Sequence, residues 1–281
     1  MSKILVVANQ KGGVGKTTTA VNLSASLAAT KRKVLMVDLD PQGNATMGCG
    51  IDKHDLELSL YDVLTAKCDI SAAIVTSANA GFDVVPTNSD LTAAEVELMD
   101  MPNRESRLSS ALEEVSADYD YIIIDCPPAL SMLTINAMVA AQGVLIPMQC
   151  EYYALEGLSA LMQTIEKIKT KLNPELEIEG ILRTMYDPRN SLTTDVSTQL
   201  ITHFGDKVYS TVIPRNVRLA EAPSYGLPVL AYDKNSRGAV AYLALAGEMN
   251  RRTKSKKSAA KKTSTNKAAG STAGKKAISQ A

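Results

Sequence analysis

The ten residues from position 9 to position 18 have the composition of a phosphate-binding loop. They read Asn-Gln-Lys-Gly-Gly-Val-Gly-Lys-Thr-Thr, so that Lys11 and Lys16 flank a run of glycines. Glycines let backbone N–H groups approach phosphate oxygens, and the N-terminus of a following helix adds a favourable dipole. Lys16 would neutralise the β- and γ-phosphates, and the Thr17 hydroxyl would ligate Mg²⁺. A general loop of this kind needs only Lys16, so the additional Lys11 indicates a nucleotide switch that works as a pair. The residues expected to bind nucleotide are Lys11, Gly12, Gly13, Val14, Gly15, Lys16, Thr17 and Thr18.

Three carboxylates follow apolar runs and are candidates for the same chemistry. Asp125 follows the run 121–124 and precedes Cys126 and two prolines, which end a strand. A carboxylate at that position can hold the Mg²⁺ shell through water, as a Walker B aspartate does. Asp38 and Asp40 end another run, and alternation along an extended strand predicts that both face the phosphates. For any one of them a turn or a helix cap is the commoner role, but beside a phosphate loop catalysis is favoured.

Strand and helix patterns alternate along residues 1–250 and define the elements that must position these groups. This alternation predicts an α/β fold: a mostly parallel twisted sheet with helices on both faces, of the P-loop NTPase type. Ligands then bind beyond the carboxyl ends of the strands. The expected strands are 3–8, 33–37, 82–85, 121–124, 143–146, 177–182 and 208–213; the expected helices are 17–29, 91–99, 103–117, 131–141, 155–172 and 192–203.

Charge divides the chain into a domain, 1–250, and a basic tail, 251–281. The whole chain has 30 basic and 30 acidic residues, but ten of the basic ones and no acidic one follow Glu248. The domain therefore carries about −10 and the tail about +10. A tail rich in Lys, Ala, Ser, Thr and Gly cannot build a core and is expected to be disordered. It either attracts nucleic-acid phosphates or only keeps the protein in solution, and the sequence leaves both open.

Composition excludes several classes of protein. No apolar stretch reaches the roughly 18 residues of a membrane span, and no signal peptide opens the chain, so a cytoplasmic protein is expected. The four cysteines, at positions 49, 68, 126 and 150, form no C-x-x-C pair and the chain has two histidines, so neither a zinc nor an iron–sulfur site is indicated.

Several segments together resemble the ParA/Soj family of chromosome- and plasmid-partition ATPases, which belongs to the deviant Walker A class with MinD. The similarity covers about residues 1–250 and leaves out the tail. The segments that carry it are the loop with its early Lys11, Asp38-Leu-Asp-Pro-Gln-Gly-Asn44, Tyr121-Ile-Ile-Ile-Asp-Cys-Pro-Pro128, Gln149-Cys-Glu-Tyr-Tyr-Ala-Leu-Glu-Gly-Leu158 and Ile213-Pro-Arg-Asn-Val-Arg-Leu-Ala-Glu-Ala-Pro223.

The resemblance implies roles for individual residues. Lys11 corresponds to the signature lysine that reaches the partner's nucleotide in an ATP-sandwich dimer, much as an arginine finger does. Gly12 corresponds to a small residue that lets the two loops approach. Asp40 corresponds to the aspartate that positions the attacking water, and Asp38 would support the metal or the loop. The remaining implied contacts are Pro214 and Asn216 beside adenine, and Arg189 and Arg218 on DNA.

The resemblance also implies a cycle. ATP and Mg²⁺ close a homodimer, the dimer binds DNA without sequence preference, and a ParB-type centromere-binding protein stimulates an otherwise slow hydrolysis that releases DNA. The protein would then be associated with the nucleoid, with no stable membrane association. The alternatives are a MinD-like membrane-associated or other cargo-positioning ATPase, although the tail has only Ile278 as a large apolar residue, and a metabolic ligase on the same fold.

Overall fold

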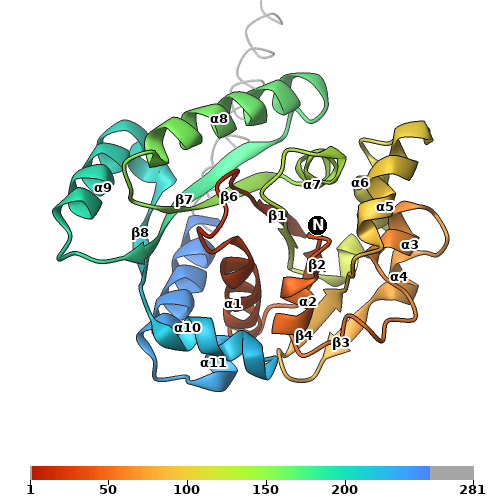
Figure 1. Cartoon of the computed structure of the whole chain (residues 1–281), viewed down its shortest axis with the longest axis horizontal. Coiled ribbons are helices and arrows are strands. Elements are labelled where there is room, and N and C mark those ends of the chain that lie inside the picture. Colours follow the sequence, from red (N-terminus) through yellow and green to blue (C-terminus); the bar gives the residue numbers. More distant parts are fainter. Residues whose placement is uncertain (1, 254–281) are drawn as a thin grey trace, which may run out of the picture.

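A single twisted sheet organises the part of the chain that the computed structural model describes, residues 2–253. Its strand order is β3-β4-β2-β5-β1-β6-β7-β8, and all neighbouring pairs are parallel except β3 and β4 (Figure 1). The carboxyl ends of the parallel strands therefore meet at one edge of the sheet. The strands are β1 Lys3–Val7, β2 Val34–Asp38, β3 Val75–Ser77, β4 Phe82–Val85, β5 Tyr121–Asp125, β6 Gly143–Gln149, β7 Glu177–Tyr186 and β8 Val208–Pro214.

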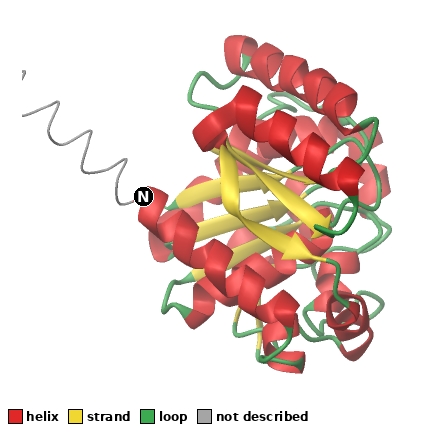
Figure 2. Ribbon diagram, turned by 90° about the vertical axis from the view of Figure 1, so that its left-hand side faces the viewer, coloured by secondary structure: helices red, strands yellow, loops and turns green. Residues whose placement is uncertain are grey.

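Helices cover both faces of this sheet (Figure 2). The central strands β2 and β5 are buried along their whole length, as strands of a covered parallel sheet must be. Two apolar cores result, one on each face. The helices are α1 Lys16–Ala29, α2 Asn44–Gly48, α3 Leu60–Leu64, α4 Ile70–Ala73, α5 Leu91–Glu97, α6 Arg107–Val115, α7 Met132–Ala140, α8 Ala154–Lys171, α9 Ser191–Phe204, α10 Val217–Glu221, α11 Val229–Tyr232 and a last helix over residues 237–253.

The predicted α/β fold is confirmed, with differences at a few boundaries and with several elements that were not predicted: β3, α2, α3, α4, α10, α11 and the last helix. The helix expected over 103–117 begins at Arg107, because Asn103 has a left-handed φ of 52°. The strand expected to end at 146 continues through Pro147 to Gln149. This proline is tolerated because β6 pairs with β1 only over residues 143–145, so its missing N–H removes no ladder bond on that side.

The boundary expected at residue 250 lies too early. Residues 251–253 continue the last helix, because Arg252 is held by the domain: its Nη2 lies 2.7 Å from Oε1 of Glu248, and its Nη1 donates to the carbonyl of Asp206 at 2.8 Å. The rest of the predicted tail, 254–281, lies outside the described residues.

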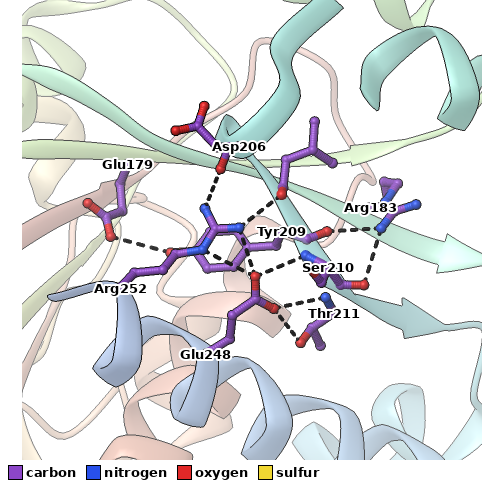
Figure 3. Close-up of polar contacts among 9 residues, drawn as sticks. Glu179, Arg183, Asp206, Tyr209, Ser210, Thr211, Glu248 and Arg252 are labelled. Atoms are coloured by element: carbon purple, nitrogen blue, oxygen red, sulfur yellow. Dashed lines mark hydrogen bonds and ion pairs between the residues drawn. The ribbon is translucent and has the colours of Figure 1, made fainter. Parts of the chain in front are cut away.

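A polar cluster fixes this last helix to the amino ends of β7 and β8 (Figure 3). We call Glu179, Arg183, Tyr209, Glu248 and Arg252 the amino-end cluster. Glu248 accepts hydrogen bonds from the backbone N–H groups of Ser210 and Thr211, both at 2.9 Å, and so satisfies donors of the edge strand β8. Arg252 lies over the Tyr209 ring at 4.1 Å, and the Arg183 guanidinium donates to the Tyr209 carbonyl at 2.9 Å. The cluster borders a cavity of about 570 Å³ at the opposite end of the strands from the phosphate loop.

Candidate functional site

The predicted phosphate loop lies between β1 and α1, at the carboxyl edge of the sheet. Gly13 and Gly15 have φ values of 73° and 87°, a conformation that side chains with a Cβ rarely adopt. Gly15 directly precedes α1, at the N-cap position. The first turn of α1 contains no acidic residue, and no side chain caps its N-terminus. The backbone N–H groups at this helix start remain suited to an anion. A Cβ on Gly12 would meet no atom within 4 Å, so this position is open on the loop surface.

Lys16 folds back over the loop and is almost completely buried. Its residue exposure is 7%, and its Nζ donates to the carbonyl of Lys11 at 3.2 Å. It forms no ion pair with any carboxylate of the described residues. Burial lowers the pKa of Lys16, and the charges of Asp125 and Asp40 partly oppose that shift. Lys16 is thus a desolvated cation held beside a set of N–H donors, which is suited to a polyphosphate.

Lys11 points away from the loop and is held by its own chain. Its Nζ lies 2.5 Å from Oε2 of Glu151, with side-chain exposures of 43% and 50% for the two residues. The Lys11 N–H donates to Oδ1 of Asn9 at 3.0 Å, while the Asn9 amide donates to the carbonyl of Pro147 at 2.8 Å. The loop start is therefore fixed to β6, whereas the Lys11 ammonium is held by an exposed ion pair that is easily exchanged.

Asp125, at the end of β5, is completely buried, and neither of its oxygens has a hydrogen-bond partner among the described residues. Burial raises the pKa of Asp125 well above its ordinary range, and the charge of neighbouring Asp38 adds to the shift, while the Lys16 charge opposes it. A buried carboxylate with unused oxygens is a place where a cation belongs. The described residues contain no group of three or more His, Cys, Asp or Glu side chains that could hold a metal alone.

Asp38 and Asp40 occupy different environments, contrary to the expectation that both face the phosphates. Strand β2 ends at Asp38, so the extended alternation does not continue to Asp40. Asp38 is fully buried, and its oxygens accept from the Thr46 N–H and hydroxyl, both at 2.7 Å, and from the Asp40 N–H at 3.2 Å. Burial raises the pKa of Asp38 to about 6. The Thr46 hydroxyl in turn accepts from the Thr87 N–H at 3.0 Å, so Asp38 braces the loop that carries Asp40.

Asp40 itself is only half-buried. Its Oδ1 accepts from the Gln42 N–H at 3.0 Å in a local turn. Its charge lies close enough to raise the pKa values of Lys16 and Asp125. Of the two aspartates, Asp40 is the one whose carboxylate remains available beside the loop.

A cavity of about 330 Å³ opens next to the start of α1. Pro214 and Asn216, at or just after the end of β8, line it together with Gly15 and Thr18 of the phosphate loop and α1. Asn216 also accepts from the Arg218 N–H at 3.0 Å and caps α10, so its carbonyl oxygen is already used. The complete lining is Gly15, Thr18, Thr184, Met185, Ile213, Pro214, Arg215, Asn216, Val217, Leu219, Ala220 and Tyr242.

The end of β7 contributes residues that the sequence did not indicate. The Thr184 hydroxyl donates to the carbonyl of Val14 at 2.8 Å and so ties β7 to the phosphate loop. Met185, the next residue, has a φ of 48°, an unusual conformation that here lies on the wall of the cavity. The expected strand ended at 182, and a threonine and a methionine carry no signal that would have extended the site to them.

Arg189 and Arg218 form separate ion pairs within the protomer. Arg189 lies in the loop after β7 and pairs with Asp187 at 2.7 Å, while Arg218 lies on α10 and pairs with Glu221 at 2.7 Å. Both arginines are accessible, with side-chain exposures of 88% and 47%.

No helix in the described part of the chain is long and apolar enough to cross a bilayer.

A parallel α/β sheet with a glycine-rich loop ending in Gly-Lys-Thr, a buried strand-end aspartate and an early lysine defines a P-loop nucleotide-binding protein of the deviant Walker A type. Comparison with known proteins agrees. A family model described as AAA domain matches residues 2–178. Soj, a sporulation initiation inhibitor protein of Bacillus subtilis, is 54% identical over 89% of this chain and 98% of its own length. The chromosome partitioning protein ParA of Caulobacter vibrioides is 52% identical over 88% of this chain and 93% of its own length.

The solved structures include one from Mycobacterium smegmatis described as cobyrinic acid a,c-diamide synthase with bound ADP and magnesium. It has a TM-score of 0.80 and 38% identity, and the match covers 91% of this chain and 96% of that one. The identities to Soj and ParA are higher and extend over nearly their whole lengths. The chain therefore belongs to the ParA/Soj family.

Proposed function

We propose that this protein is a partition ATPase, which hydrolyses ATP in order to position DNA. The observation that carries the proposal is the pair of buried charged groups at the loop, the Lys16 ammonium without an ion pair in the described chain and the unpartnered Asp125 carboxylate, in a chain 54% identical to Soj. Neither group contributes favourably to the fold as it stands, and both suit a magnesium–nucleotide complex.

The loop residues have distinct parts in binding ATP and Mg²⁺. The N–H groups from Gly12 to Thr18 and the Lys16 ammonium would hold the phosphates. The Thr17 hydroxyl and, through water, Asp125 would hold the cation, whose role when bound is to neutralise charge on the phosphoryl oxygens. Pro214 and Asn216 would position adenine in the cavity that they line.

Lys11 and Asp40 would make hydrolysis depend on a second protomer. Lys11 must exchange its ion pair with Glu151 for the nucleotide of a partner, and exposed pairs of this kind cost only about 0.2–1 kcal/mol to break. Asp40, whose free carboxylate oxygen faces no described donor, would orient the attacking water. The homodimer would thus close only with nucleotide present, because a ligand shifts an equilibrium only by binding one state better.

DNA would bind across the closed dimer, through Arg189 and Arg218 of both protomers. Two weak sites held together gain avidity, so opening the dimer after hydrolysis releases DNA. A ParB-type centromere-binding protein would stimulate that step. We place the protein in the cytoplasm, associated with the nucleoid.

A second function has a specific observation in its favour. The Mycobacterium smegmatis structure is described as a cobyrinic acid a,c-diamide synthase, so a ligase that forms amides of a carboxylic acid is the competing class. A ligase would consume ATP without DNA and would need no dimer-dependent DNA contact.

Retention on DNA distinguishes the two functions. We expect the full chain to bind non-specific duplex DNA with ATP and Mg²⁺ but not with ADP or without nucleotide. Asp40→Ala should dimerise with ATP and stay on DNA while releasing little phosphate, as sedimentation and phosphate assays can show together. Equal DNA binding with ATP, with ADP and without nucleotide would refute the proposed function in DNA partition.

A further inference from the structure

The two arginines proposed for DNA binding are each occupied by carboxylates of the same chain. Arg189 forms a two-bond fork with Asp187: Nε donates to Oδ1 at 2.9 Å and Nη2 to Oδ2 at 2.7 Å. The Asp187 Oδ1 also accepts from the Arg189 N–H at 3.1 Å, so the short loop is built around this pair. The Nε–Nη2 edge of the guanidinium, one of the two edges that can bind a phosphate as a fork, is therefore filled.

Arg218 is held from two sides. Its Nη1 donates to Oε2 of Glu221 at 2.7 Å, and its Nε lies 3.4 Å from Oδ2 of Asp233, which comes from the segment after α11. Glu221 is itself oriented by the Tyr232 hydroxyl at 3.4 Å, and Tyr232 stacks on Tyr225 with ring centroids 5.0 Å apart. The carboxylates are therefore placed by the fold and do not depend on Arg218 alone.

Carboxylate and phosphate compete for the same guanidinium geometry, because each offers two oxygens to the planar N–H fork. The competitor beside Arg189 is always present: hydrogen bonds from Arg189 lower the pKa of Asp187 to about 2, so that it is ionised at every pH of interest. Both arginines are nevertheless solvent-accessible, and exposed pairs exchange readily. DNA can displace the carboxylates, but with reduced affinity.

We propose that Asp187, Glu221 and Asp233 are built-in competitors that weaken the DNA contact of a single protomer, so that DNA is held only when two protomers act together. The proposal rests on the proposed function. Weak binding by a single protomer would favour the release of DNA after hydrolysis. Avidity makes a dimer bind DNA far better than its separated protomers only if each protomer binds weakly. Carboxylates beside the arginines set that weakness without altering the nucleotide site.

The test removes one competitor and keeps its shape. Asp187→Asn retains Oδ1 as the acceptor for the Arg189 N–H but loses the charge. The matched control is Asp195→Asn, on α9, an exposed aspartate with no ion pair to any described residue, which changes the net charge equally. The readout is the dissociation constant for non-specific duplex DNA with ATP and Mg²⁺, across a series of salt concentrations.

From the range measured for exposed ion pairs, Asp187→Asn should tighten DNA binding about two- to fivefold per protomer relative to Asp195→Asn. Asp187→Asn combined with Arg189→Ala should show no such gain over Arg189→Ala alone, because the competitor would then have nothing to compete for. Asp233→Asn should give a gain that depends on Arg218 in the same way.

Each outcome is decisive. If Asp187→Asn and Asp233→Asn bind DNA no better than Asp195→Asn, the inference is overturned. The same holds if the gain survives Arg189→Ala, because the effect would then be one of net charge. If the unaltered protein shows no ATP-dependent DNA binding at all, the proposed function fails instead.

Discussion

Buried charged groups at the amino end of the sheet are matched by the chain, whereas two of those at the carboxyl end, Asp125 and Lys16, are not. At the amino end, Glu248 accepts from two backbone N–H groups and pairs with Arg252 (Figure 3). Glu179 there pairs with Lys3 at 2.6 Å. At the carboxyl end, both oxygens of Asp125 are without a partner among the described residues, and Lys16 has only a carbonyl.

This difference separates groups that hold the fold together from groups that are kept for a ligand. A buried charge that is matched by the chain itself restrains an edge strand and a helix, and its removal should be felt as lost stability. A buried charge without a match costs stability, and its retention at one edge marks that edge as the site.

Lys16→Ala should give the largest effect and should be purely catalytic. We expect ATP hydrolysis to fall at least about a hundredfold, the scale seen when one charge-stabilising donor is removed from an active site. Thermal stability without nucleotide should be unchanged or higher, because a desolvated cation is lost. Phosphate release and a melting curve on the same preparation measure the activity and the stability. A large drop in melting temperature would mean that Lys16 stabilises the fold, and the difference between the two ends of the sheet would then not hold.

Glu248→Ala should do the reverse. It leaves the N–H groups of Ser210 and Thr211 without their acceptor and removes the carboxylate that pairs with Arg252, at an expected cost of about 3 kcal/mol. For a domain of this size that corresponds to roughly 6–12 °C in melting temperature. Glu175→Ala, at an exposed glutamate of the same region, is the control and should change little. Hydrolysis per folded molecule should be normal, and a catalytic defect would contradict a purely structural cluster.

Asp125→Asn should sharpen the comparison through pH. The folded-state pKa of Asp125 is raised, so the native protein holds this proton more tightly than the unfolded chain does, and the wild type loses stability as pH rises above about 4. Asparagine does not titrate. The variant should therefore be the more stable protein at neutral pH without nucleotide, and the difference should shrink towards pH 4. Melting curves across pH test this prediction. If the difference in stability between the variant and the wild type is constant with pH, the pKa of Asp125 is not raised by folding.

Much of this architecture could be predicted from the sequence because its signals are local. The apolar run of β1, the glycines and Lys16 adjoin one another, and Asp125 directly follows its strand. Contacts between distant segments could not be predicted. Asp38 stabilises its loop through Thr46 and Thr87, which follow it in the sequence. Thr184 connects β7 to the phosphate loop, and Asp233 restrains Arg218.

The empty surroundings of Gly12 have a consequence for genetics. Because a Cβ there meets nothing within 4 Å in the protomer, Gly12→Ala should yield protein that accumulates at normal levels in cells. Any loss of DNA segregation by such an allele would then report on a neighbouring molecule and not on misfolding. A single methyl group would thus separate the folding of this chain from what its phosphate loop does with a nucleotide or a second copy.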